Sequence, residues 1–197
     1  MNDVIRAALA PVRGRFLLIE PPSTLVIDLA RLQGASMVTA LHRGRRRARR
    51  SREKLAAVKD IAGKTSVVRG SLDHLPLVGA SVEAVVCARG LPHHIDPVDA
   101  LRSLRRAVRP GGLVLVVSRL REGPIGVIGS LLRRAAWAGD LPRASDLTAW
   151  MLHAGMRSVR QAVLPRTVVP GALTWAQVRH RPWEEEAPTV APPSSRP

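Results

Sequence analysis

The chain has 197 residues, 46% of them hydrophobic, and its 31 Lys or Arg against 15 Asp or Glu give a formal net charge of +16. This length and apolar content suffice for a folded core and exclude a wholly disordered chain, while the apolar runs are too short to span a bilayer. The arginine-interrupted N-terminus argues against a signal peptide, and the single cysteine, Cys87, excludes a disulfide within the chain, so we expect a protein of the reducing cytoplasm.

Strand-like and helix-like segments alternate along most of the chain, after a short leading helix over residues 2–10. The apolar patterns predict strands over residues 15–19, 36–41, 66–69, 84–87 and 113–117. They predict helices over residues 24–32, 45–62, 124–138 and 145–154, with one more around residues 100–108. This alternation predicts an α/β fold with a doubly wound sheet that binds ligands at the carboxyl ends of its strands.

The stretch from Glu83 to Ser118 has the clearest pattern. Two continuous apolar runs, typical of strands buried on both faces, flank an amphipathic helix whose solvent side is rich in arginine. Pro110-Gly111-Gly112 cannot continue that helix and predicts a turn into the next strand. We therefore expect a βαβ unit within a single domain over residues 1–181.

Five prolines and three consecutive glutamates predict a disordered tail over residues 182–197.

This stretch resembles the class I S-adenosylmethionine (SAM) dependent methyltransferases, in the branch similar to ubiquinone/menaquinone C-methyltransferases. Residues 91–97, LPHHIDP, resemble that branch's substrate loop, and Arg109-Pro110-Gly111-Gly112 resembles its Arg-Pro-Gly-Gly turn. Residues 67–77 resemble the strand and loop that come before it. The resemblance implies a Rossmann-like sheet of about seven strands, with a final antiparallel pair over residues 159–164 and 172–179. It also implies that His93 and His94 lie over a substrate pocket.

The positions that hold SAM in this family are mostly changed in this chain. The glycine-rich turn falls on residues 19–23, which contain no glycine, and Pro21 and Pro22 have no N–H to offer the cofactor. The acid that grips the ribose falls on His42, and the acid beside the adenine falls on Ser71. The resemblance places the pocket at Glu20, Ser23, His42, Ser71, Leu72 and Ala88.

Arginine is concentrated where the second strand should end. Residues 43–69 carry eleven basic and two acidic side chains, which is more than half of the net charge. The densest run contains Arg43, Arg45, Arg46, Arg47, Arg49, Arg50 and Arg52. Such a run suits the phosphate backbone of a nucleic acid or an acidic protein surface, although a solvated helix in an arginine-rich proteome is the alternative. Aromatic residues make up only 3% and include no tyrosine, so base stacking has little support.

Other candidate sites are weaker. Adjacent histidines such as His93 and His94 rarely face one ion, and no Cys or carboxylate set completes a ligand group, so we expect no metal site. Asp73 and Glu83 are better explained as structural acids at strand ends than as a catalytic pair. Cys87 falls in a buried strand without a base, and we identify no catalytic residue.

The sequence therefore favours a degenerate methyltransferase-like protein, a pseudoenzyme that uses no cofactor and binds a partner through its basic face. The alternative is an active SAM-dependent methyltransferase that acts on a small molecule and has an atypical cofactor pocket.

Overall fold

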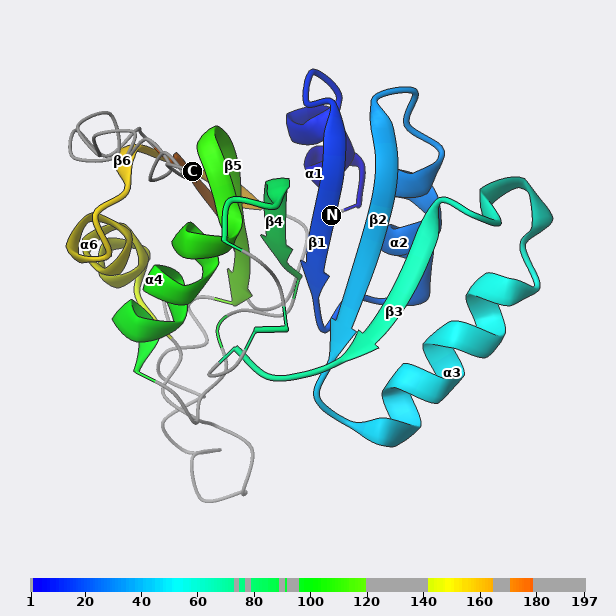
Figure 1. Cartoon of the computed structure of the whole chain (residues 1–197). Helices are drawn as coiled ribbons and strands as arrows, with labels where there is room; N and C mark the ends of the chain where they lie inside the picture. Colours follow the sequence, from blue (N-terminus) through cyan, green and yellow to red (C-terminus); the bar gives the residue numbers. More distant parts are fainter. Residues whose placement is uncertain are drawn as a thin grey trace, which may run out of the picture.

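The computed structural model describes residues 2–72, 75–76, 79–88, 91, 96–119, 142–164 and 171–178. One sheet runs through the molecule with helices on both faces (Figure 1). The predicted helix over residues 124–138, the pair His93 and His94, and the tail over residues 182–197 lie outside the described residues.

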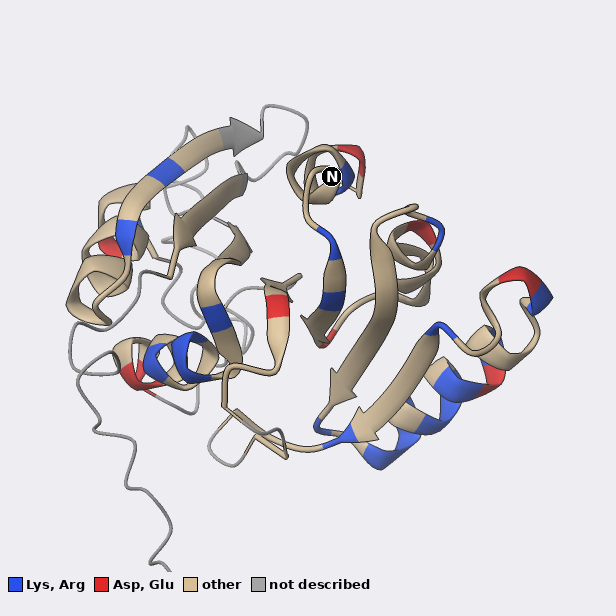
Figure 2. Cartoon of the chain, turned by 45° about the horizontal axis from the view of Figure 1, so that its top comes forward, with Lys and Arg blue, Asp and Glu red and all other residues tan. Residues whose placement is uncertain are grey.

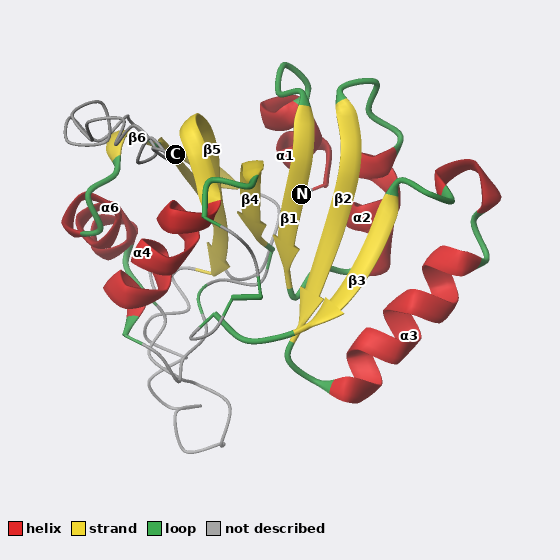
Figure 3. Cartoon of the chain, viewed as in Figure 1, coloured by secondary structure: helices red, strands yellow, loops and turns green. Residues whose placement is uncertain are grey.

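The sheet has seven strands in the order β3-β2-β1-β4-β5-β7-β6. The strands are β1 (Gly14–Ile19), β2 (Ala35–His42), β3 (Thr65–Arg69), β4 (Val82–Cys87), β5 (Val108–Arg119), β6 (Arg157–Leu164) and β7 (Gly171–Gln177). The described helices are α1 (Asn2–Leu9), α2 (Ser23–Ala30), α3 (Arg45–Ala56), α4 (Pro97–Ala107) and α6 (Ala144–His153), with a 3₁₀ helix η1 (Lys59–Ile61) (Figure 3). Strands β1 to β5 pair in parallel, and β7 is antiparallel to both β5 and β6. The predicted Rossmann-like fold with a final antiparallel pair is confirmed.

The core has two layers, one on each face of the sheet. Because side chains alternate along a strand, Leu17 and Ile19 pack with α4 and α6, while Phe16 and Leu18 pack with α1, α2 and α3. All four side chains are buried. Burial on both faces is the reason why the strands are continuous apolar runs rather than alternating ones. Among the described helices, none is long and apolar enough to cross a bilayer.

Helix α4 begins at Pro97, three residues before the predicted apolar stretch, and its start is marked by local contacts. The carboxylate of Asp96 accepts hydrogen bonds from the N–H groups of Val98, at 2.8 Å, and Asp99, at 3.1 Å. Pro97, which has no N–H to satisfy, occupies the first turn of the helix. The Asp-Pro pair is therefore a local start signal that depends on no distant contact.

Helix α3 is shorter than predicted. It ends at Ala56, and the extended backbone of Val58 leads into η1. This break brings Ile61, which is fully buried, back against the core on the α1–α3 face. The buried residues of α3 itself are Ala48, Ser51 and Leu55, and Val58 after the helix is partly buried against the same core layer.

The Pro110-Gly111-Gly112 segment is a bulge inside β5 rather than a turn before it. The register between β4 and β5 shifts between Val82 and Ala84, opposite this segment. Gly111 has a left-handed φ of +82°. The Gly112 carbonyl accepts a hydrogen bond from the Val178 N–H at 3.0 Å. The helix stop was predicted correctly, but pairing on both sides keeps these glycines within the strand.

Glu83 joins three strands at the edge where β1 and β4 begin. Its carboxylate accepts a hydrogen bond from the N–H of Arg15 and forms an ion pair of 2.8 Å with the guanidinium of Arg109. Arg109 also donates to the carbonyl of Ala80 at 3.2 Å. These contacts give Glu83 a structural role, as the sequence predicted. Asp73, its suggested partner acid, lies outside the described residues.

Candidate functional site

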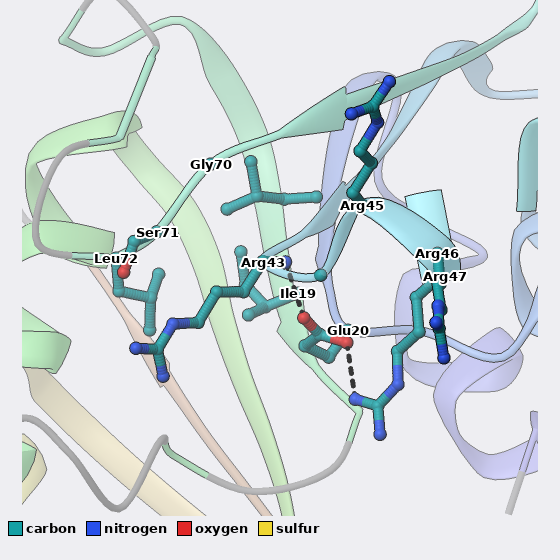
Figure 4. Close-up of a pocket in the computed structure, with 11 residues that line it drawn as sticks. Ile19, Glu20, Arg43, Arg45, Arg46, Arg47, Gly70, Ser71 and Leu72 are labelled. Carbon is teal, nitrogen blue, oxygen red and sulfur yellow. Dashed lines mark hydrogen bonds and ion pairs between the residues drawn. The ribbon is translucent and has the colours of Figure 1, made fainter. Parts of the chain in front are cut away.

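A cavity of about 690 Å³ opens at the carboxyl ends of β1, β2 and β3 (Figure 4). Open α/β sheets usually bind their ligands at this edge, and the volume is that of a small-molecule site. The residues that line it are Ile19, Glu20, Leu41, Arg43, Gly44, Arg45, Arg46, Arg47, Gly70, Ser71 and Leu72.

The lining has an apolar part and a charged part. Ile19, Leu41 and Leu72 are buried and come from the ends of β1 and β2 and the segment after β3. Gly70 allows the backbone to pass closely here, because a Cβ at this position would lie 3.0 Å from a methyl group of Leu41 and from a ring carbon of Pro76. The charged part consists of four arginines and one glutamate.

Glu20 bridges the end of β1 and the junction of β2 with α3. Its carboxylate accepts a hydrogen bond from the N–H of Arg43 at 2.7 Å and one from the guanidinium of Arg47 at 3.0 Å (Figure 4). The Nδ1 of His42 lies 3.5 Å from the same carboxylate. Glu20 itself has a left-handed φ of +48°, and its N–H donates to the carbonyl of Leu41 at 2.9 Å. The carboxylate is thus held across the crevice between two strands.

These contacts make Glu20 an unusually strong acid. His42 contributes most and is joined by the Arg43 N–H and Arg47, and together they outweigh the opposing effect of burial. They lower the pKa of Glu20 from its ordinary value of 4.5 to about 2. Glu20 is therefore ionised at neutral pH and stabilises the positive charge around it.

The lowered pKa predicts an acid-sensitive contribution to stability. A carboxyl group whose pKa is depressed by folding stabilises the protein above its unfolded pKa and loses that contribution as the pH falls toward its folded pKa. For Glu20 the loss should occur between about pH 4.5 and pH 2. It should amount to about 2 to 3 kcal/mol.

Urea denaturation from pH 7 to pH 2.5 tests this expectation. The unfolding free energy of Glu20→Gln should depend less steeply on pH below about pH 4.5 than that of the wild type. Parallel curves for the two proteins would contradict the assignment of this acid sensitivity to Glu20.

The start of α3 adds to the positive field. Its N-cap residue, Gly44, supplies no side chain to accept from the first N–H groups, and the first turn contains no acidic residue. The unsatisfied N–H groups and the helix dipole favour an anion here, whereas the residues present are arginines. In Figure 2 much of the ribbon of this helix has the blue colour of Lys and Arg.

The arginines of this run divide into two groups. Arg43, Arg45, Arg46 and Arg47 line the cavity, whereas Arg49, Arg50 and Arg52 lie further along α3. All seven are exposed. Three have partners: Arg47 pairs with Glu20, Arg49 lies 3.1 Å from Glu53, and Arg52 donates to the carbonyl of Val67 at 3.3 Å. Within the described ranges, the guanidinium groups of the other four form no ion pair.

The predicted cofactor positions are only partly brought together. Glu20, Ser71 and Leu72 line the cavity. Ser23 begins α2, and Ala88 is buried after β4 with its N–H donating to the carbonyl of Ile19 at 3.4 Å; neither is among the described lining residues. The ion pair of Glu20 with Arg47 was not predicted, since no local pattern links residues 27 positions apart.

His42 is the last residue of β2 and lies at the position where the resemblance implies an acid that binds the ribose. Its side chain is only 4% exposed, and its Nδ1 is turned toward Glu20. Its Nε2 is buried and has no hydrogen-bond partner in the part of the chain that the structure describes. At the end of β2 the cavity is therefore lined by Leu41, Arg43 and Gly44 rather than by His42.

Among the described residues we find neither a reactive thiol nor a metal-binding cluster. Burial raises the pKa of the Cys87 thiol to about 12, which keeps it protonated and unreactive at neutral pH. In the described ranges, no group of three or more His, Cys, Asp or Glu side chains is placed to hold a metal ion.

Comparison with known families gives one match. The methyltransferase domain family matches residues 24–116, which is just under half of the chain. The match covers α2 to β5 and therefore includes the arginine run and the Pro-Gly-Gly bulge. It confirms the resemblance to methyltransferases but does not test the ubiquinone/menaquinone branch. Among curated proteins, no relative matches the chain significantly.

Solved structures with the same fold are numerous and distant in sequence. The SAM-dependent methyltransferase SibL in its apo form has a TM-score of 0.70 and 22% identity over 91% of this chain and 55% of its own. Geranyl diphosphate methyltransferase in complex with SAM has a TM-score of 0.71 and 11% identity over 90% of this chain and 84% of its own. The [4+2]-cyclase SpnF has a TM-score of 0.73 and 12% identity over 91% of this chain and 80% of its own. At these identities the likeness establishes the class I methyltransferase fold.

Proposed function

We propose that this chain, which has the class I methyltransferase fold, is a pseudoenzyme that binds a phosphate-bearing polyanion through its basic cavity and α3. One observation carries the proposal: the cavity at the ligand-binding edge of the sheet is lined by four arginines against one glutamate. A cavity with this excess of positive charge favours anionic ligands.

The donor set of the cavity does not fit SAM as the resemblance describes its binding. The cofactor carries a sulfonium cation, which the arginines would repel. The turn after β1 has no glycine, and Pro21 and Pro22 offer no N–H to the cofactor's carboxylate. Glu20, the remaining acid, is already engaged by Arg43 and Arg47. These features support a binding role without SAM.

The outer arginines extend the cavity into a longer surface. Arg49, Arg50 and Arg52 are exposed on the same helix whose first turn lines the cavity. Guanidinium groups spread along one helix suit a phosphodiester backbone, which presents negative charge at regular intervals. With few aromatic residues for stacking, we expect contacts to phosphates rather than to bases. We propose the reducing cytoplasm as its compartment, on the basis of the single buried Cys87.

An active SAM-dependent methyltransferase is the second candidate. The observation that favours it is the position of the cavity, at the strand edge where Ser71 and Leu72 replace the adenine-side residues of the family. Its volume of about 690 Å³ is large enough for a cofactor of that size.

Binding titrations of the full chain separate the two candidates. We expect a fluorescent single-stranded oligonucleotide to bind, with an affinity that falls steeply between roughly 50 and 200 mM salt, and SAM to show no binding. Micromolar SAM binding that is lost in Ser71→Ala would overturn the proposal in favour of the enzyme. Binding of polyglutamate in preference to the oligonucleotide would instead assign the basic surface to an acidic protein partner.

A further inference from the structure

The carboxylate of Glu20 occupies an anion-binding position in the basic cavity. The N–H of Arg43, at 2.7 Å, and the guanidinium of Arg47, at 3.0 Å, converge on its carboxylate. The His42 Nδ1 lies 3.5 Å from the same group. These donors come from the end of β2 and the first turn of α3, and their positions are set by the sheet and the helix. They form a preorganised site for an oxyanion.

The single negative charge of Glu20 balances only part of the positive charge of this site. The side chains of Arg43, Arg45 and Arg46 line the same cavity and have no acidic partner in the described part of the chain. Figure 4 shows the Arg43 side chain extending away from Glu20 while Arg47 reaches toward it. A phosphate, which has more oxygens and up to two negative charges, would accept from both the Arg47 guanidinium and the Arg43 N–H.

We infer that the donors which now hold the Glu20 carboxylate form a site for one phosphate group, and that the bound phosphate displaces Glu20. This inference rests on the proposed function and assigns one place in the cavity to its ligand. The ligand class is a phosphomonoester or phosphodiester, whose tetrahedral oxygens suit several converging donors.

The local geometry permits the exchange. The Glu20 side chain is 22% exposed, so it has a route to solvent, and its backbone stays anchored through the N–H bond to the Leu41 carbonyl. Gly44, which precedes α3, has open space around it, with no atom within 4 Å of a Cβ placed there. A phosphate can therefore approach the first N–H groups of α3 without meeting a side chain at position 44.

Removal of the competing charge is the direct test. Inorganic phosphate and a single-stranded oligonucleotide are titrated into the full-length wild type, Glu20→Gln and Glu53→Gln. We expect Glu20→Gln to bind both probes at least about tenfold more tightly, because it no longer places a like charge at the site. Glu53→Gln makes the same charge change beside another α3 arginine, outside the cavity, and should alter the affinity for inorganic phosphate less than about twofold.

A second pair of variants does not depend on Glu20. Arg47→Gln removes a donor of the site and should weaken the binding of inorganic phosphate at least about tenfold. Arg157→Gln, an exposed arginine on β6 outside the cavity, should change it less than about twofold. Thermal melting of each variant confirms that it is folded before titration.

The outcomes separate this inference from the function on which it rests. If the wild type binds the oligonucleotide but Glu20→Gln and Glu53→Gln change the affinity for inorganic phosphate equally, the phosphate site is wrong while the basic surface stands. If neither probe binds the wild type or Glu20→Gln, the proposed function itself fails. With the site supported, a preference for a 5′-phosphorylated over a 5′-hydroxyl oligonucleotide indicates a terminal monoester. Equal binding of the two indicates an internal phosphodiester.

Discussion

Replacing five arginines of α3 by glutamine is expected to lower the affinity for a single-stranded oligonucleotide at least about a hundredfold at low salt. The five are Arg45, Arg46, Arg47, Arg49 and Arg50. Each phosphate contact with a single strand contributes about 0.7 to the slope of log K against log salt, so losing five should reduce that slope by about 3.5. Fluorescence anisotropy across a salt series measures both quantities.

A matched control separates local contacts from net charge. Five exposed arginines on other elements are replaced in the same way, which changes the formal charge equally. They are Arg6, Arg102, Arg106, Arg157 and Arg160. This control should retain most of the affinity, because charges distant from the bound strand are screened by salt. Equal losses of affinity in both variants would show that net charge, and not contact with α3, accounts for binding. Unchanged affinity in the α3 variant would contradict the proposed basic surface altogether.

The substitution Gly112→Ala should lower the free energy of unfolding by about 3 kcal/mol or more. A Cβ at this position would lie 2.5 Å from the carbonyl oxygen of Glu83 and 3.0 Å from that of Arg109. Both are backbone atoms, one of them in the neighbouring strand, so the clash is relieved only by moving β4 away from β5. Urea denaturation measures the loss.

Gly111→Ala is the control for this prediction. Gly111 has the left-handed φ of +82°, but a Cβ there would meet no atom within 4 Å. The cost should therefore be confined to the strained backbone, about 1 to 2 kcal/mol. If the two alanine variants were equally stable, close packing at Gly112 would not be the reason for its glycine.

Much of the local structure could be predicted because its causes lie close together in the chain. The cap at Asp96, the proline at position 97 and the helix stop at Pro110 act on neighbouring backbone groups. The continuous apolar strands follow from burial on both faces. The absence of glycines after β1 was also visible, because that motif is local.

The length of helix α3 could not be predicted from local sequence patterns. Its arginine density was evident from the sequence, but its length was not. The helix breaks before Val58 because Ile61 is buried against the core on the α1–α3 face, and periodicity does not reveal that contact. Likewise, Pro110-Gly111-Gly112 has the composition of a turn, and only pairing with β4 and with the segment after β7 keeps it within β5.

Residue types and near-neighbour spacing are enough to predict the α/β alternation, the resemblance to the methyltransferase fold and the absence of glycine from residues 19–23. The folded arrangement alone turns Glu20 across the crevice to Arg43 and Arg47, and it places four arginines in the cavity lining and three beyond it. The physical reason is that parallel pairing of β1 with β2 brings their carboxyl ends together. Contacts between residues more than twenty positions apart depend on that pairing and on the direction in which the next helix leaves the sheet.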